Sequence, residues 1–284
     1  MIRMPACVRI RLDIAYDGTD FSGWARQPVL RTCQGLLEAA LSTVLQREVT
    51  VTVAGRTDAG VHATGQVAHF DAPEGFVLDD RLPQRLNSLM RASDIAVLAA
   101  SVAPVGFDAR FSAISRSYRY RLQFEAPNPL VRDRTFWPRP LDADAMQRAA
   151  EALIGLNDFA AFCKPREGAT TIRHLREFSW HEVETDGPGR VLEARLLADA
   201  FCHSMVRSLV GACVAVGEGR MNLAKAESLL SERKRVGGFT LMPPQGLVLH
   251  AVGYPPEGEL EAQSRRARAK RSEEDVQSAA RYDA

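Results

Sequence analysis

The chain has 284 residues, 46% of them hydrophobic, which is enough for one large domain or about two, with a sizeable core. The formal net charge is +1, so the overall charge neither favours nor excludes a nucleic-acid partner, which local basic patches would have to bind. Five cysteines at wide, irregular spacing exclude the common zinc patterns and favour buried thiols in a reducing compartment. The sequence lacks the apolar runs of a signal peptide or a membrane span, so we expect a cytoplasmic protein.

In the first part of the chain, hydrophobic residues recur with the spacing of a strand in some segments and with that of a helix in others. In chain order these predict a strand at 8–14, a helix at 34–45, strands at 49–53 and 66–70, a helix at 82–89, and strands at 95–101 and 117–124. A proline-rich loop at 128–140 follows, and we place a domain boundary in or near it.

The second part also contains both strand-like and helix-like segments. In chain order it predicts a helix at 143–153 capped by Asp142, strands at 176–183 and 191–197, helices at 204–216 and 223–230, the second capped by Asn222, and a strand at 246–254. Both parts favour an α+β fold with mixed, largely antiparallel sheets, helices packed on one side and two structurally related halves. We therefore expect an N-terminal half at 1–127, a C-terminal half at 128–254 and a polar charged tail at 255–284. The tail is expected to be solvated and partly disordered, with a weak phosphate-binding arm as the alternative.

A glycine-bounded loop with a single carboxylate lies between the strands at 49–53 and 66–70. Its sequence is Gly55-Arg56-Thr57-Asp58-Ala59-Gly60-Val61-His62. The glycines allow unusual backbone angles and close approach of a ligand, and a neighbouring cation would keep Asp58 ionised. Such a carboxylate suits nucleophilic attack or stabilisation of a cationic sugar. A hairpin turn with an ion pair is the alternative, because Gly and Asp are common in turns.

Three further stretches are candidates for binding. Arginines alternate with aromatic residues at 107–121, which suits phosphates and stacked bases, although a half-buried strand is the alternative. The stretch at 201–207 reads mainly as core packing, but Arg207 would need a partner such as Asp58 or a phosphate, because charges are seldom buried alone. The loop at 17–24 could contact an RNA backbone or serve as a structural loop with an aromatic anchor. The sequence contains none of the common nucleotide-binding or zinc-hydrolase motifs, so we expect no cofactor and no catalytic metal.

Together these motifs resemble the bacterial tRNA pseudouridine synthase A family. The resemblance runs in order from about Val8 to Tyr254, and the loop around Asp58 is its most specific part. It implies a pseudouridine synthase fold and an isomerase that converts uridine to pseudouridine at nucleotide positions 38 to 40 of the tRNA anticodon stem-loop. It also implies a homodimer, with RNA crossing both protomers.

The resemblance assigns roles to individual residues. The catalytic aspartate falls on Asp58 and the base-stacking tyrosine on Tyr118. The arginine beside the carboxylate corresponds to Arg56 or Arg207, of which we favour Arg207. Candidates for RNA backbone contacts are Arg110, Arg116, Arg132, Arg134, Lys164, Arg166 and Arg173. Two alternatives stay open: a non-catalytic tRNA-binding module or RNA chaperone on the same scaffold, and a uridine N-glycosidase that releases uracil.

Overall fold

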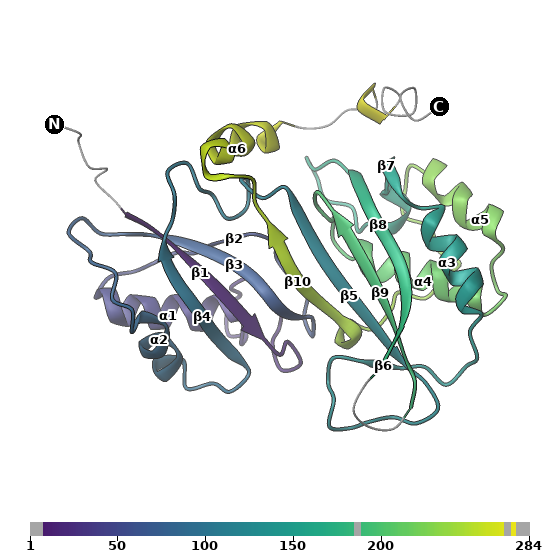
Figure 1. Cartoon of the computed structure of the whole chain (residues 1–284), viewed down its shortest axis with the longest axis horizontal. Coiled ribbons are helices and arrows are strands. Elements are labelled where there is room, and N and C mark those ends of the chain that lie inside the picture. The colour runs from purple at the N-terminus through teal and green to yellow at the C-terminus, as the bar shows by residue number, and fades with distance from the viewer. Residues whose placement is uncertain (1–7, 185–188, 270–273, 277–284) are drawn as a thin grey trace. The chain divides into compact units, whose positions relative to one another are not determined.

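Two groups of elements, each with its own strands and helices, make up the computed structural model, which describes residues 8–184, 189–269 and 274–276 (Figure 1). The first unit contains the chain up to Ile114 and Leu249–Arg268, and the second is built mainly from Ser115–Val248. The division thus lies earlier than the boundary expected at 127. In addition, the segment Leu249–Arg268 belongs to the first unit, where β10 (Leu247–Gly253) lies beside β3 (His62–Ala72).

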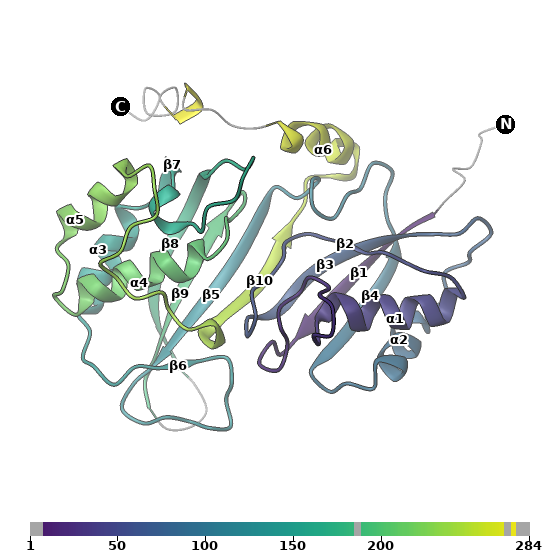
Figure 2. The ribbon, with the colours of Figure 1, turned by 180° about the vertical axis from the view of Figure 1, so that it is seen from behind.

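The first unit is a sheet with two helices on one of its faces (Figure 2). Its elements are β1 (Val8–Tyr16), α1 (Cys33–Leu45), β2 (Thr52–Val53), β3, α2 (Leu82–Met90) and β4 (Ile95–Val102). The strand order is β4-β1-β3-β10, and β1 pairs antiparallel with both β3 and β4. Alternate residues of β1 are buried, as its sequence pattern predicts.

The strand expected at 49–53 is reduced to the two residues of β2, which pair with β3. Val49 and Val51 are buried as a strand pattern requires. The backbone N–H of Val51, however, donates to the carboxylate of Glu38 at 3.1 Å, a side chain of α1. A helix side chain therefore supplies the partner that a neighbouring strand would otherwise provide.

The second unit has the same kind of architecture. Its elements are β5 (Ser115–Gln123), β6 (Thr135–Phe136), α3 (Ala143–Glu151), β7 (Gly155–Asp158), β8 (Ile172–Val183), β9 (Val191–Ala198), α4 (Met205–Gly217) and α5 (Leu223–Ser228). The strands follow the order β5-β9-β8-β7, with the short β6 parallel to the end of β5. The helix α4 is buried on nearly all sides because it is apolar all round.

Side-chain caps fix the starts of the helices where the sequence predicts them. The carboxylate of Asp142 accepts a hydrogen bond from the backbone N–H of Ala145 at 2.9 Å. The side-chain oxygen of Asn222 accepts one from Lys225 at 2.8 Å. Both predicted caps are confirmed, and each satisfies a backbone donor that the first helical turn leaves without a partner.

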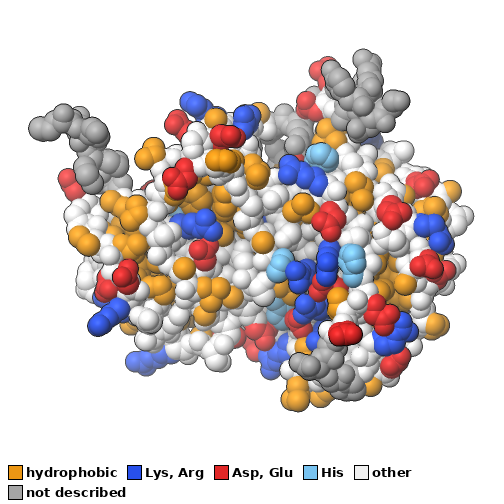
Figure 3. Space-filling model, in the orientation of Figure 1, with side chains coloured by type: hydrophobic (Ala, Val, Ile, Leu, Met, Phe, Trp, Pro, Cys, Tyr) orange, Lys and Arg blue, Asp and Glu red, His pale blue; other side chains and the backbone are white. Residues whose placement is uncertain are grey.

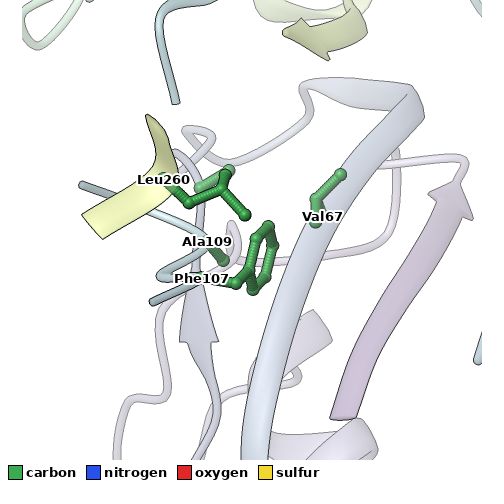
Figure 4. Packing of buried hydrophobic residues seen from close by; sticks show 5 residues of the cluster. Val67, Phe107, Ala109 and Leu260 are labelled. Atoms are coloured by element: carbon green, nitrogen blue, oxygen red, sulfur yellow. The ribbon is translucent and has the colours of Figure 1, made fainter. Parts of the chain in front are cut away.

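The first part of the expected polar tail is ordered on the first unit. It forms a short turn at Glu257–Glu259 and the helix α6 (Leu260–Arg268). The side chain of Leu260, only 2% exposed, packs against Val67, Phe107 and Ala109 (Figure 4). One buried apolar residue thus docks an otherwise polar helix, contrary to the expectation of a solvated tail. The remainder of that predicted tail, at 270–273 and 277–284, lies outside the described residues.

The cysteines differ from the expectation of free thiols at two positions. Cys163 and Cys202 form a disulfide, with Cα atoms 5.8 Å apart, because the fold joins two loops that are 39 residues apart in sequence. Cys33 and Cys213 are free and buried, and burial raises the pKa of each thiol to about 12. Cys7 lies outside the described residues. Across the described parts of the chain, no helix has the length and apolar character needed to cross a membrane.

Candidate active site

Asp58 lies on the tight loop between β2 and β3, and its side chain is half-buried. The loop leaves the sheet at Ala54, whose backbone N–H donates to the carbonyl of Val67 at 2.8 Å. It returns through a turn in which the N–H of Val61 donates to the carbonyl of Asp58 at 3.2 Å. Within that turn Gly60 has a φ of 76°, a backbone conformation that glycine adopts without strain. The predicted combination of strand, glycine-bounded loop and strand is therefore present.

The loop at 17–24 forms a second layer that holds the Asp58 loop in place. The backbone N–H of Trp24 donates to the carbonyl of Thr57 at 3.1 Å, and that of Gly60 donates to the carbonyl of Phe21 at 3.3 Å. Phe21 and Trp24 are buried, at 3% and 0% exposure. Of the two functions that the sequence allowed for this loop, the structure supports the aromatic anchor.

Glycine is required where these two loops meet. A Cβ atom at Gly18 would lie 2.0 Å from the carbonyl oxygen of Val61, which is far inside van der Waals contact. At Gly23, where φ is 92°, a Cβ would lie 3.0 Å from the carbonyl oxygen of Thr57. The close approach of the two backbones thus depends on the missing side chains.

Gln66 supports the Asp58 loop through its side-chain amide, a role that the sequence alone does not indicate. It is fully buried in β3, and its side-chain amide donates to the carbonyl of Gly55 at 2.8 Å and to the hydroxyl of Tyr16 at 3.2 Å. Buried polar side chains need such partners. The signal in the sequence is a polar residue inside an apolar strand.

The two arginines proposed as partners of Asp58 have different environments. Arg56 is exposed, and its guanidinium makes no hydrogen bond or ion pair with any residue that the structure describes. Arg207 is half-buried in the first turn of α4, where its Nε donates to the carbonyl of Met242 at 2.6 Å. That bond restricts the orientation of the guanidinium, whereas Arg56 has no comparable constraint.

Tyr118 lies on the buried face of β5 and is 8% exposed. The ring of Phe201 packs edge-to-face against it, with centroids 5.1 Å apart and an interplanar angle of 87°. Phe201 follows β9, which is the antiparallel neighbour of β5. The sequence indicates only core packing for Phe201, but the structure gives it a position that fixes the Tyr118 ring. Asp58 belongs to the first unit, and Tyr118 and Arg207 belong to the second, so no single unit contains all three.

The cations proposed to contact RNA backbone fall into two groups. Arg110, Arg132, Lys164 and Arg166 are exposed, whereas the side chain of Arg134 is only 10% exposed. Arg116, by contrast, is 9% exposed and donates to the carbonyl of Asp199 at 2.8 Å, and Arg173 donates to the carbonyl of Ile172 at 2.6 Å. The first group is accessible to phosphates, whereas Arg116 acts mainly within the fold. Among the described residues, His, Cys, Asp and Glu side chains form no group of three or more that could hold a metal ion.

Comparisons with known proteins identify the family to which the chain belongs. A family model described as tRNA pseudouridine synthase matches residues 14–112 and 149–255. The chain is 51% identical over 285 residues to tRNA pseudouridine synthase A of Leifsonia xyli subsp. xyli, covering 93% of this chain and 98% of that protein. It is 47% identical over 289 residues to the protein of that name in Corynebacterium glutamicum, covering 97% and 99%. It is 50% identical over 269 residues to the one in Frankia casuarinae, covering 93% and 96%.

Proposed function

We propose that this chain, which belongs to the tRNA pseudouridine synthase family and is an isomerase of uridine in tRNA, uses Asp58 as its catalytic carboxylate. The observation that carries the assignment is the way two loops position this side chain. The backbone on either side of Asp58 is held by Trp24 and Phe21, while the carboxylate itself stays half-buried at the loop surface. Preorganisation of this kind lets a reactive group keep its geometry when the substrate binds.

The reaction breaks the N1–C1′ glycosidic bond, rotates the uracil and forms a C5–C1′ bond. The C5 proton is lost and N1 gains a proton, so the product is an isomer and no redox cofactor is needed. As the first bond breaks, C1′ becomes electron-poor, and an adjacent carboxylate can stabilise it as an ion pair or attack it covalently, as in glycoside chemistry. Glycosidases add a second carboxylate to protonate the leaving group or activate water. Because uracil is a tolerable anion and must rejoin the sugar, one carboxylate is enough.

Tyr118 and Arg207 complete the proposed site. The ring of Tyr118 would stack on the uracil and limit its escape, and the contact with Phe201 supports this role by fixing the ring. Arg207 would pair with Asp58 and keep the carboxylate anionic. The bond from Arg207 to Met242 supports Arg207 over Arg56, whose guanidinium has no such constraint.

The proposed substrate region is the anticodon stem-loop, at nucleotide positions 38 to 40. A base in such a structure must be flipped out, at a cost of a few kcal/mol. Phosphate contacts from exposed cations such as Arg110, Lys164 and Arg166 would offset that cost. Affinity for tRNA should therefore fall steeply with added salt, and a flat response would contradict this basic surface.

A cytoplasmic homodimer is the proposed working form, with tRNA crossing both protomers. A large L-shaped RNA extends beyond one active site, so a second subunit would add contacts. Sedimentation velocity at working concentrations checks this, and a monomer that is active on tRNA would contradict it.

The direct test is release of tritium from tRNA labelled at uracil C5, with native protein and with Asp58→Ala. We expect release from the native protein and none from the variant, while both bind tRNA in a filter assay. Free uracil among the products would indicate a uridine N-glycosidase instead. Binding of tRNA without release by the native protein would indicate a non-catalytic binding module.

A further inference from the structure

The face of the second unit's sheet that is free of helices carries a hollow lined with arginines. It has a volume of about 1090 Å³, and its five arginines are Arg119, Arg121, Arg134, Arg190 and Arg195. In Figure 3, side chains of lysine and arginine gather over β5 and β9, with acidic side chains among them. Arg119 and Arg121 alternate along β5 with buried neighbours, so they point away from the core.

A single carboxylate at the floor of the hollow is shared by three of these arginines. Glu193 on β9 has a side chain that is 1% exposed. Its oxygens lie 2.8 Å from Nε of Arg121, 3.0 Å from Nε of Arg195 and 3.9 Å from Nε of Arg119. Hydrogen bonds from Arg121 and Arg195 keep the pKa of this carboxyl below its usual value, despite a burial that acts in the opposite direction. One negative charge therefore faces three positive charges.

The other acidic side chains near the hollow reduce its excess of positive charge but do not remove it. Glu182 pairs with Arg190 at 2.8 Å, Glu184 also lines the hollow, and Asp133 pairs with Arg121 from its edge. Among the residues that the structure describes, five arginines and three glutamates line the hollow, so positive side chains outnumber negative ones by two there.

Arg134 supplies an independent sign of a ligand. Its side chain is 10% exposed, and its Nε and Nη1 atoms are buried without a hydrogen-bond partner among the residues that the structure describes. The nearest carboxylate oxygen, on Asp133, lies 3.7 Å from Nε, beyond hydrogen-bond distance. Leaving the donors of a buried guanidinium unsatisfied is costly, so this side chain is suited to an acceptor that enters the hollow.

We propose that this hollow, in the second unit, binds phosphate groups of an RNA backbone. The planar fork of an arginine matches the oxygens of a phosphate, and several forks along one wall fit successive phosphates of a strand. The inference rests on the proposed tRNA substrate and extends it, because it adds a contact surface on the helix-free face of the sheet.

The test measures binding of a labelled, uridine-free oligoadenylate by fluorescence anisotropy over a series of salt concentrations. Arg134→Gln should raise the Kd about tenfold and reduce the slope of log K against log salt by about one. Arg190→Gln, at an exposed position of the hollow, provides a second measurement of the Kd and the salt slope if Arg134→Gln unfolds. The matched control is Arg148→Gln, which removes an exposed arginine from α3 on the other face of the sheet and should leave the Kd within about twofold.

Three outcomes overturn the proposal. Unchanged affinity and slope in both hollow variants would show that no phosphate binds there. An equal loss in Arg148→Gln would show a general charge effect. A change in oligomeric state without loss of RNA affinity would assign the hollow to a second copy of the chain. Tritium release by the native protein is measured in parallel, so failure of the proposed reaction remains distinct from failure of this surface.

Discussion

The hydroxyl groups of Tyr16 and Thr57 lie 2.7 Å apart and share a hydrogen bond. Tyr16 is the last residue of β1, and Thr57 directly precedes Asp58. The bond therefore connects the sheet to the residue beside the proposed catalytic carboxylate. Both groups are buried, so the bond is protected from competition with water.

Removal of this bond should displace Asp58 without touching the substrate. Thr57→Val is expected to lower kcat for tritium release about tenfold, with little change in the KM for tRNA, because small displacements of a reacting group are costly. The free energy of unfolding should fall by about 1 kcal/mol. Thr57→Ser keeps the hydroxyl and should restore most of the rate; failure of this rescue would count against a positioning role.

Substitutions at Gly18 and Gly55 form a matched pair that tests the close packing of the 17–24 loop against the Asp58 loop. Gly18→Ala would place a methyl group 2.0 Å from the Val61 carbonyl oxygen, whereas a Cβ at Gly55 has nothing within 4 Å. We expect Gly18→Ala to lower the unfolding midpoint in urea and reduce tritium release, since the backbone has to move. Gly55→Ala should leave the midpoint nearly unchanged. Equal midpoints for the two variants would contradict this packing.

The ring of Tyr118 is proposed to stack on the target base. Tyr118→Phe keeps the aromatic face and its contact with Phe201, so its Kd for tRNA should stay within about twofold of the native value. Tyr118→Ala should raise the Kd about tenfold, because stacking on an aromatic ring contributes roughly 1–3 kcal/mol per base. Anisotropy with Asp58→Ala as the background keeps turnover out of the measurement. Equal affinity of the Phe and Ala variants would exclude stacking.

His69 should make stability depend on pH. Burial, with a smaller effect from Arg9, lowers its pKa from 6.5 to about 4, and its Nδ1 accepts a hydrogen bond from the backbone of Ala109 at 3.0 Å. Between these two values the unfolded chain binds more protons than the folded one. The contribution of His69 to the free energy of unfolding is therefore complete above about pH 6.5. It is lost as the pH falls toward 4, which lowers the free energy of unfolding by up to about 3 kcal/mol.

Urea titrations between pH 7 and 4 check this prediction. His69→Asn keeps an acceptor near the position of Nδ1 and should show a shallower decline in the free energy of unfolding than the native protein. His181→Asn, at an exposed position, is the control and should follow the native curve. A native-like decline in His69→Asn would assign the acid sensitivity to other groups.

Local sequence determined much of the fold and the placement of Asp58 on a glycine-bounded loop. Alternation in β1 and β5, the caps at Asp142 and Asn222, and the glycine-bounded loop depend on interactions within a few residues, and all were predictable. The resemblance to a known family added the reaction, and the matches of the family model and of the relatives confirm that membership.

Contacts between distant segments were decided only by the tertiary structure. Thr57 meets Tyr16 across 41 positions of sequence, Phe201 reaches Tyr118 across neighbouring strands, and Leu260 docks α6 on the first unit. The arginine-lined hollow likewise depends on the register that places Arg121 opposite Glu193. Such contacts depend on strand register and on the path by which the chain brings distant segments together. Local propensities do not specify either of these, because local propensities act only between near neighbours in the chain.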